Sequence, residues 1–438
     1  MSNSRGLLSV LGLGFGLAVL VGNTIGMGIL RTPGVVAAHL PSVPWYLAVW
    51  VIGALYALLG ALTLAELAAM HPRSGGLFPL VERGLGRYAG LVSGWTDWVA
   101  TCCSVAAVAM VFGEYVEPYA EALRGQAAWI AAGVVAGFAL LQARGIRLGS
   151  RVQTLSSLLK ALALVALAVV ALWATPAAAP PAAADLAALP SGLALAAAVV
   201  VALQSAIYTY DGWSGPVYFG EEVRDPGRDL PRAMIGGVLL VLAIYLLLNL
   251  AFLRVVPIAE MAGDPFVAAT AATRLFGAAG ESILRALMLI SLLAAISALL
   301  LMASRVPHAL AHSGLLPARF GRANAGGTPV LSLAFSTLLA LVFLGTRSFD
   351  AVLALLAFFF VANYVLAFTA LFVLRRREPD APRPFRVPGY PWIPGLALLS
   401  SVVFLIAAIL GDLQHSLLAL AVLGLSVPAY ALTRRSGR

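Results

Sequence analysis

Charged side chains are scarce in this chain of 438 residues, since only 11% are Asp, Glu, Lys or Arg while 61% are hydrophobic. Soluble globular domains carry roughly 25% charged residues. The apolar residues gather into runs of about 20, which is the length that an α-helix needs to cross a bilayer. The sequence therefore predicts an all-α membrane protein with many spans, and it argues against a soluble domain.

Cysteines and catalytic motifs are scarce as well. The two cysteines, Cys102 and Cys103, are adjacent in an apolar run, which indicates packing and not a disulfide or a metal pair. The five histidines show no second ligand at metal spacing, and neither H-E-x-x-H nor G-x-S-x-G occurs. We therefore expect no metal, no cofactor and no enzymatic activity. Almost all the arginines lie in alternate loops between apolar runs, so their excess does not indicate a nucleic-acid partner.

Twelve transmembrane helices are predicted from the apolar runs, separated by short polar segments. One inner segment, 70–90, is long and patterned enough to hold a short amphipathic helix. The outer segment 256–281 is semi-apolar and forms either a lid over the outer mouth or an ordinary surface loop. The predicted spans cover residues 7–38, 44–70, 89–116, 127–143, 152–174, 192–220, 232–254, 282–306, 329–345, 350–374, 392–411 and 414–433.

The distribution of positive charge predicts the orientation of these spans. Most of the 28 basic residues lie in alternate segments, which include the N-terminal one and the C-terminal one. Loops on the cytoplasmic side of membrane proteins are enriched in arginine and lysine. We therefore expect a multi-pass protein of the cytoplasmic (inner) membrane, with both termini in the cytoplasm.

The first span is interrupted at its centre by the stretch Val21–Gly34, VGNTIGMGILRTPG. Gly22, Gly26 and Gly28 fall within it, and the apolar flanks place them at membrane depth. Bare backbone at that depth persists only where it lines a cavity or is buried in protein. Freed amides at the start of the second half-helix can hold an anion, and freed carbonyls at the end of the first can hold a cation.

The sixth span, Leu193–Gly220, has a second interruption. Gly212, Gly215 and Pro216 break it at mid-depth, and Asp211 lies beside them. The two breaks occupy corresponding positions in two halves of five spans each. Paired interruptions of this kind are a sequence pointer to the binding site of a transporter, whereas unrelated packing kinks are the alternative.

Four motifs of the chain occur in the same order in a known protein family. IGMGIL with TPG behind it follows the first half-helix, and TYDGW precedes GEEVRDPGRDLPRA (220–233). SRVPHALAHSGLLPARF (304–320) and RRREPDAPRPFRVPGYPWIP (375–394) lie in later cytoplasmic segments. In this order they resemble the amino acid–polyamine–organocation (APC) superfamily, nearest to bacterial amino acid permeases and L-type exchangers. The resemblance implies amino acid transport and a LeuT-type five-plus-five inverted repeat with helices 1 and 6 broken.

The resemblance also implies a domain division. A transporter core covers 1–390, in which spans one to five (about 7–175) and spans six to ten (about 191–375) form the inverted repeats. Residues 391–438 then form two additional C-terminal transmembrane helices outside the repeat.

In the family the substrate carboxylate sits on the amides of the glycine motif, and the ammonium meets carbonyls at both breaks. An aromatic residue on the sixth span serves as an outer gate, and Tyr208 falls at that position. Met27 departs from the usual Ser or Ala, although the backbone role does not depend on that side chain. The substrate-binding residues implied in this way are Thr24, Ile25, Gly26, Met27, Gly28, Ile29, Tyr208, Asp211 and Gly212.

Lys160, in the middle of the fifth span, is the only lysine of the chain. Burial disfavours its ammonium form, whereas an arginine would stay charged. Sodium-independent members of the family carry a lysine on this span, where sodium-coupled relatives place a sodium ion. The resemblance therefore implies a coupling role, in which the ammonium bridges to carbonyls of the first break. A structural polar contact or snorkelling to the interface is the alternative.

Other acidic residues lie at the edges of the spans. Asp211 either contacts a substrate amine or caps the half-helix, and Asp97 either pairs at the inner face or belongs to the pocket. We expect Glu66 to pair with a cytoplasmic arginine. Four further charged residues are predicted to form an inner gate or brace: Glu221, Glu222, Arg224 and Arg228.

The sequence thus favours a permease that moves amino acids by alternating access, as a proton symporter or an exchanger without sodium. Its expected partners are an amino acid substrate, protons in the symport case and the lipid bilayer, with no obligatory partner chain. Two alternatives stay open. One is a carrier of polyamines or organic cations, which would need pocket carboxylates beyond Asp211. The other is a solute sensor on the same fold without net transport.

Overall fold

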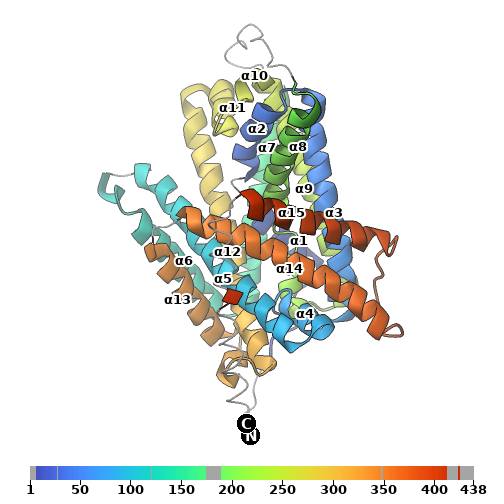
Figure 1. The fold of residues 1–438 in the computed structure, drawn as a ribbon. Helices are drawn as coiled ribbons and strands as arrows, with labels where there is room; N and C mark the ends of the chain where they lie inside the picture. Colours follow the sequence, from blue (N-terminus) through green and yellow to red (C-terminus); the bar gives the residue numbers. More distant parts are fainter. Residues whose placement is uncertain are drawn as a thin grey trace.

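The computed structural model describes residues 6–26, 28–119, 121–173, 189–346, 349–411 and 423–424. Over these residues the chain is helical and contains no strand, only two isolated β-bridges. The long helices form one bundle, and α14 and α15 cross in front of it (Figure 1). The prediction of an all-α fold is confirmed for the described part of the chain.

The first span is broken as expected. Helix α1 (Leu13–Thr24) and helix α2 (Gly28–His39) are bent by 49° relative to one another. α1 packs against α7, α9 and α12, while α2 packs against α8. The two halves of this span therefore pack against different helices.

The sixth span is also broken, but its second half differs from the expected half-helix. Helix α8 (Gly192–Tyr210) ends at Asp211, and the chain continues as the 3₁₀ turns η3 (Gly215–Tyr218) and η4 (Gly220–Glu222). Gly212 has a φ of +117°, which favours glycine. Pro216 has no amide proton to donate to an α-helical ladder.

Most of the remaining predicted spans are long apolar helices. Seven described helices are long and apolar enough to cross a membrane, or eight if the bent α1–α2 pair counts as one span. Three shorter apolar helices lie at further predicted spans. Twelve spans and the inverted repeat thus stay predictions, and the last span, 414–433, falls almost entirely outside the described residues. The bounds of the long helices are α3 (Val43–Met70), α5 (Arg87–Val116), α6 (Ala127–Ala143), α7 (Ile146–Trp173), α9 (Pro226–Val255), α12 (Gly280–His312), α13 (Val330–Thr346), α14 (Phe349–Arg377) and α15 (Trp392–Gly411).

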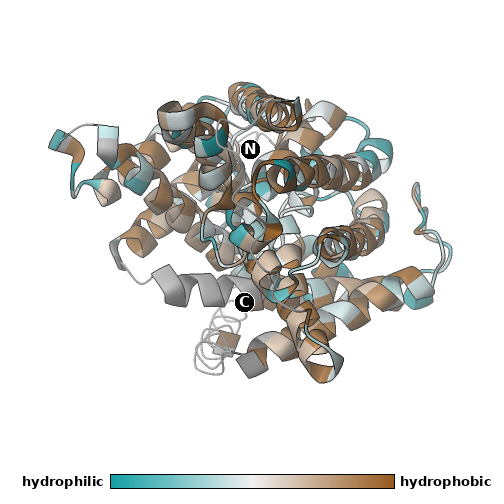
Figure 2. Ribbon diagram, turned by 90° about the horizontal axis from the view of Figure 1, so that it is seen from above, coloured by the Kyte–Doolittle hydropathy of each residue, from teal (hydrophilic) through white to brown (hydrophobic). Residues whose placement is uncertain are grey.

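Hydrophobic residues make up most of the long helices (Figure 2). Large apolar side chains are widely exposed, for example Leu193 at 90% and Trp129 at 75%. Soluble proteins rarely expose wide contiguous apolar surface. A lipid environment explains this exposure, as the composition predicts.

Short helices complete the two ends of the bundle. The amphipathic helix expected in segment 70–90 is present as α4 (Phe78–Leu85). Segment 256–281, predicted to lie on the outer side, holds α10 (Ile258–Met261) and α11 (Val267–Phe276), which pack on α2, so much of it is helical and not a plain loop. The remaining short elements are η1 (Glu117–Tyr119), η2 (Glu121–Leu123), η5 (Gly277–Ala279) and η6 (Ala318–Gly321).

Candidate functional site

The two breaks lie directly against each other. A Cβ on Gly212 would be 2.9 Å from both the amide nitrogen and the hydroxyl of Thr24. Likewise, a Cβ on Gly28 would be 2.9 Å from Thr209 at the end of α8. Glycine at these two positions therefore allows the backbones of the first and sixth spans to approach.

The carbonyls at the end of α1 are held by side chains of neighbouring helices. The Tyr245 hydroxyl lies 3.0 Å from the carbonyl oxygens of both Thr24 and Thr209, so it joins the two breaks. The Ser291 hydroxyl donates to the Ile25 carbonyl over 3.2 Å. Each carbonyl oxygen has two lone pairs. The carbonyls of Thr24 and Ile25 can therefore each accept a further hydrogen bond, for example from the ammonium of the predicted substrate.

Lys160 lies under the first break with no exposed surface. Its Nζ donates to the carbonyl of Gly22 at 3.0 Å and to that of Ser291 at 3.4 Å. Among the described residues no carboxylate forms an ion pair with it. Close packing fixes this arrangement, because a Cβ on Gly22 would overlap Gln153 and lie 2.6 Å from Ser157 Oγ.

The glycines of the first break do not share one role. Gly22 and Gly28 are needed for packing, as described above. In contrast, a Cβ on Gly26 would meet no described atom within 4 Å. Space therefore remains beside the backbone at Gly26. The neighbouring side chains of Ile25 and Ile29 are fully buried, and Met27 lies outside the described residues.

Asp211 and Tyr208 come together on the other side of α8. The Tyr364 hydroxyl donates to Asp211 Oδ1 over 2.6 Å. Both residues line a small cavity with aromatic side chains of α3, α14 and α15, among them Tyr56 and Phe404. Thr209, one residue after Tyr208, faces Gly28 instead. The structure thus groups Tyr208 with Asp211 and groups Thr209 with the first break.

The two glutamates of the predicted inner gate or brace form ion pairs with arginines of other elements. Glu222 forms a fully buried ion pair with Arg305 of α12, with N–O distances of 2.9 and 3.0 Å. Glu221 pairs with Arg73 at 3.1 Å. Arg224 and Arg228, which the sequence groups with these glutamates, form no ion pair with them in the described part of the chain, so the role of this group as a gate or brace stays a prediction.

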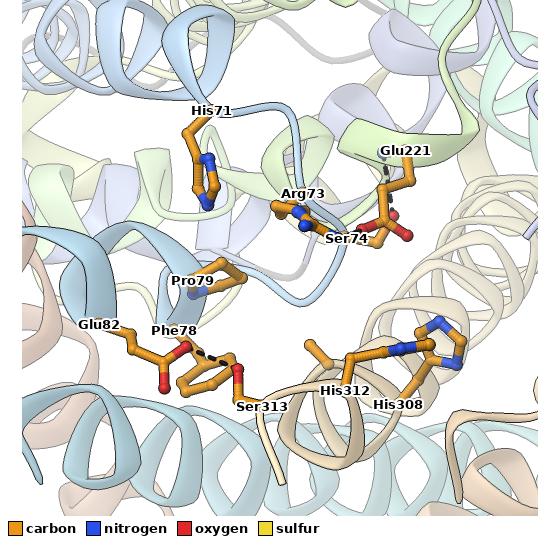
Figure 3. A pocket seen from close by; sticks show the side chains of 11 residues that line it. His71, Arg73, Ser74, Phe78, Pro79, Glu82, Glu221, His308, His312 and Ser313 are labelled. Carbon is orange, nitrogen blue, oxygen red and sulfur yellow. Dashed lines mark hydrogen bonds and ion pairs between the residues drawn. The ribbon is translucent and has the colours of Figure 1, made fainter. Parts of the chain in front are cut away.

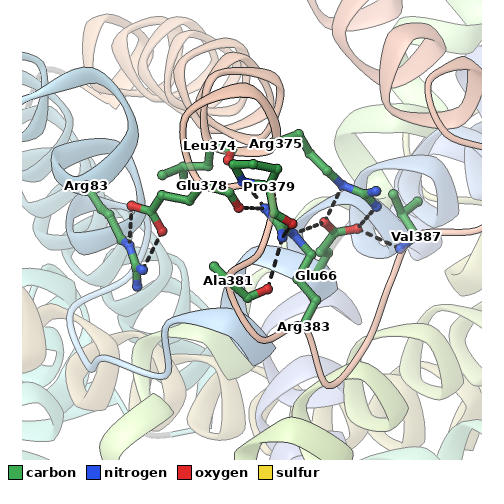
Figure 4. Close-up of polar contacts among 9 residues, drawn as sticks. All are labelled: Glu66, Arg83, Leu374, Arg375, Glu378, Pro379, Ala381, Arg383 and Val387. Atoms are coloured by element: carbon green, nitrogen blue, oxygen red, sulfur yellow. Dashed lines mark hydrogen bonds and ion pairs between the residues drawn. The ribbon is translucent and has the colours of Figure 1, made fainter.

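Glu66 pairs with two arginines at the end of α14 and in the segment after it, which is predicted to be cytoplasmic (Figure 4). Arg375 contacts it at 2.5 Å and Arg383 at 3.2 Å, and the Val387 amide donates to it at 2.7 Å. This buried carboxylate therefore fixes the segment after α14 against the end of α3. Asp97 is buried too and accepts a hydrogen bond from Tyr218 over 2.6 Å.

Sequence reasoning missed Tyr245, Ser291 and Tyr364 as partners of the breaks. A signal was present for Tyr245, since it lies with Asn249 inside an otherwise apolar run, LAIYLLLNLAF. Polar residues inside membrane helices commonly hydrogen-bond across to neighbouring helices. Ser291 and Tyr364 show no comparable pattern in the sequence.

Comparison with known proteins shows similarity along nearly the whole chain. Residues 6–426 match the family model described as amino acid permease. The chain is 28% identical over 435 residues to the serine/threonine exchanger SteT of Bacillus subtilis (strain 168), covering 98% of each chain. It is 27% identical over 406 residues to b(0,+)-type amino acid transporter 1 of Homo sapiens, covering 91% of this chain and 82% of that one. It is also 27% identical over 438 residues to large neutral amino acids transporter small subunit 2 of Mus musculus, covering 96% and 80%.

Proposed function

Since the chain belongs to the amino acid permease family, we propose that it exchanges neutral amino acids across the cytoplasmic membrane by alternating access. The name and the 98% coverage of the bacterial serine/threonine exchanger support serine and threonine as the substrates to test first. Proton symport is the alternative coupling. Both termini would lie in the cytoplasm, in accord with the positive charge of the inner segments.

The substrate zwitterion would lie between the two breaks. Its carboxylate would bind the amides that open α2, at Met27, Gly28 and Ile29, since the first amides of a helix have no partner within the helix and favour an anion. Its ammonium would meet the carbonyls of Thr24 and Ile25. The open space beside Gly26 supports this placement, because the backbone is accessible there.

The observation that carries the proposal is the contact between Lys160 and the Gly22 carbonyl at 3.0 Å. An ammonium that is held by carbonyls alone occupies the position of a bound cation at the first break. It links α7 to the last turn of α1. We therefore infer transport that does not depend on sodium and that fails when this ammonium is removed.

The test is uptake of labelled L-serine into proteoliposomes that contain the purified full-length protein. We expect uptake that requires internal serine or threonine and that stays the same when choline replaces sodium. Gly26→Leu, which fills the open space, should abolish uptake without a loss of thermal stability. A strict sodium requirement would contradict the proposal, and uptake into empty vesicles that follows a proton gradient would favour symport.

One observation favours a second candidate, a carrier of amines. Asp211 shares its cavity with Tyr56, Tyr208 and Tyr364, and a carboxylate among aromatic rings suits an organic cation. Thermal stabilisation by polyamines but not by serine, lost in Asp211→Asn, would support this candidate. Ligand binding without any counterflow would instead indicate the sensor.

A further inference from the structure

A polar cavity lies among segments that are predicted to be cytoplasmic, and Figure 3 shows the side chains that line it. Its volume is about 130 Å³. The walls come from three places: the segment between α3 and α4 with α4 itself, η4, and the last turn of α12. The lining residues are His71, Arg73, Ser74, Phe78, Pro79, Glu82, Glu221, His308, Ala309, His312 and Ser313.

Opposite charges face each other across this cavity. Arg73 lies on the same side as Glu221, and Glu82 lies across from them next to Ser313 (Figure 3). One nitrogen of Arg73 bonds to Glu221 at 3.1 Å, and a guanidinium offers five N–H donors. Arg73 can therefore bind a further carboxylate without losing its partner.

Glu82 offers the complementary negative group. One of its oxygens accepts a hydrogen bond from the Ser313 hydroxyl over 2.6 Å. No described cation forms an ion pair with it. Burial raises the pKa of the Glu82 carboxyl, which means that water and neighbours only partly compensate its charge. A carboxylate in this position favours an ammonium.

Imidazoles complete the lining with neutral polar groups. Burial, together with Arg83 and Arg73, lowers the pKa of His71 to about 4, so its ring is neutral and accepts a hydrogen bond from Arg83 at 3.0 Å. His308 is 1% exposed, and neither ring nitrogen has a hydrogen-bond partner among the described residues. The neutral ring of His71 therefore adds no charge to the cavity, whereas the ring nitrogens of His308 are too buried to contact an occupant.

The size of the cavity limits its occupant. An engineered cavity of about 150 Å³ accepts benzene, which has six heavy atoms. A space of about 130 Å³ therefore suits a molecule with about as many heavy atoms. Glycine, alanine and serine fall in this range, and each carries an ammonium for Glu82 and a carboxylate for Arg73, which both line the cavity.

We propose that this cavity is a second binding site for a small zwitterionic amino acid, with Glu82 binding the ammonium and Arg73 binding the carboxylate. The inference rests on the proposed function for the kind of solute, but it concerns a different site. Its occupant would touch Glu221, the residue before the buried Glu222–Arg305 pair. A cytoplasmic amino acid would thus be held next to the inner gate.

Equilibrium binding of labelled L-serine to the purified full-length protein tests the proposal. We expect two molecules per chain in the wild type, and one in Glu82→Gln, whose cavity should bind at least about tenfold more weakly. Asp380→Asn, which neutralises an exposed carboxylate on the same face, is the matched control and should still bind two. Gly26→Leu, which fills the central space, should retain only the cavity site.

Two competitors test whether the cavity requires both the ammonium and the carboxylate of its ligand. Ethanolamine lacks the carboxylate and lactate lacks the ammonium, so neither should displace serine from the cavity of Gly26→Leu at concentrations where unlabelled glycine does. Displacement by lactate alone, or by inorganic phosphate, would indicate an anion site and overturn the proposal.

The outcomes also separate the two sites. A single serine that Gly26→Leu removes and Glu82→Gln spares would overturn this inference and leave the proposed function intact. A single serine that Glu82→Gln removes and Gly26→Leu spares would support the cavity site and count against the central one. Absence of serine binding in the wild type would overturn the inference.

Discussion

Lys160 and Arg305 are both cations without exposed surface, yet their charges are compensated in different ways. Arg305 makes a two-pronged contact with the carboxylate of Glu222 and lies 5.1 Å from the centre of the Phe219 ring. Among the described residues Lys160 donates only to the carbonyls of Gly22 and Ser291. One cation is therefore part of a neutral pair, and the other is a net charge held by dipoles.

This difference indicates two roles. A guanidinium keeps its charge under all ordinary conditions and matches a carboxylate with two parallel bonds. Such a pair suits a fixed brace between η4 and α12 at the inner end of the second break. An ammonium on backbone carbonyls can leave or rotate with less loss, which suits an element that moves together with the first break during transport.

Removing Arg305 should have the largest effect on stability. In Arg305→Met the Glu222 carboxylate stays buried without its partner, and breaking a buried pair in this way costs about 3–5 kcal/mol. We expect a strongly lowered melting temperature of the purified protein in detergent. The double variant Arg305→Met/Glu222→Leu should recover most of the stability, since it leaves no unpaired charge. A single variant that melts like the wild type would remove the distinction between the two cations.

Removing Lys160 should affect transport more than folding. Lys160→Met takes away a charge that has no carboxylate partner among the described residues, so little uncompensated charge is left behind. We expect a folded protein with serine exchange reduced at least about tenfold, which corresponds to about 1.4 kcal/mol. Lys160→Arg should not restore exchange, because the planar guanidinium does not fit the compact site of an ammonium.

Arg151→Met is the matched control for this experiment. Arg151 lies on the same helix, α7, and its side chain is exposed. Its loss should leave exchange unchanged. Equal losses in Arg151→Met and Lys160→Met would attribute the effect to the charge of α7 in general, and normal exchange in Lys160→Met would contradict the coupling role.

The breaks and their charged partners also show which features of the structure can be predicted from the sequence. The breaks of the first and sixth spans depend on local residues, Gly22 to Gly28 and Gly212 to Pro216, so their positions could be predicted. The contact of Lys160 with a carbonyl of the first break could be predicted as well, since a single lysine in an apolar span stands out in the sequence. The 3₁₀ path after Gly212 could not, because it depends on how η3 and η4 pack.

Partners that are distant in the sequence were the main failure. Glu222 lies close to Arg224 and Arg228 along the chain, but its carboxylate meets Arg305, 83 residues away. The neighbours of Tyr208 and Thr209 are a similar case, since the two side chains point to different helices and the residue pattern of α8 does not reveal its rotation. Composition and periodicity specify elements, whereas contacts between elements require the assembled bundle.

Tyr245 should give the smallest effect and thereby sharpen the comparison, because it holds the same break as Lys160 without any charge. Tyr245→Phe keeps the ring contacts with Trp50 and Tyr210 and removes only the hydroxyl that reaches the carbonyls of Thr24 and Thr209. A lost neutral hydrogen bond costs about 1 kcal/mol. We expect a small drop in melting temperature and a partial loss of serine exchange.

Tyr46→Phe, which removes a hydroxyl bonded to Asn249 between α3 and α9, should lower stability without slowing exchange. If both variants slow exchange equally, the hydroxyl of Tyr245 only contributes to packing. If Tyr245→Phe abolishes exchange as Lys160→Met does, then the linkage of the two breaks, and not the charge at the first one, is what transport requires.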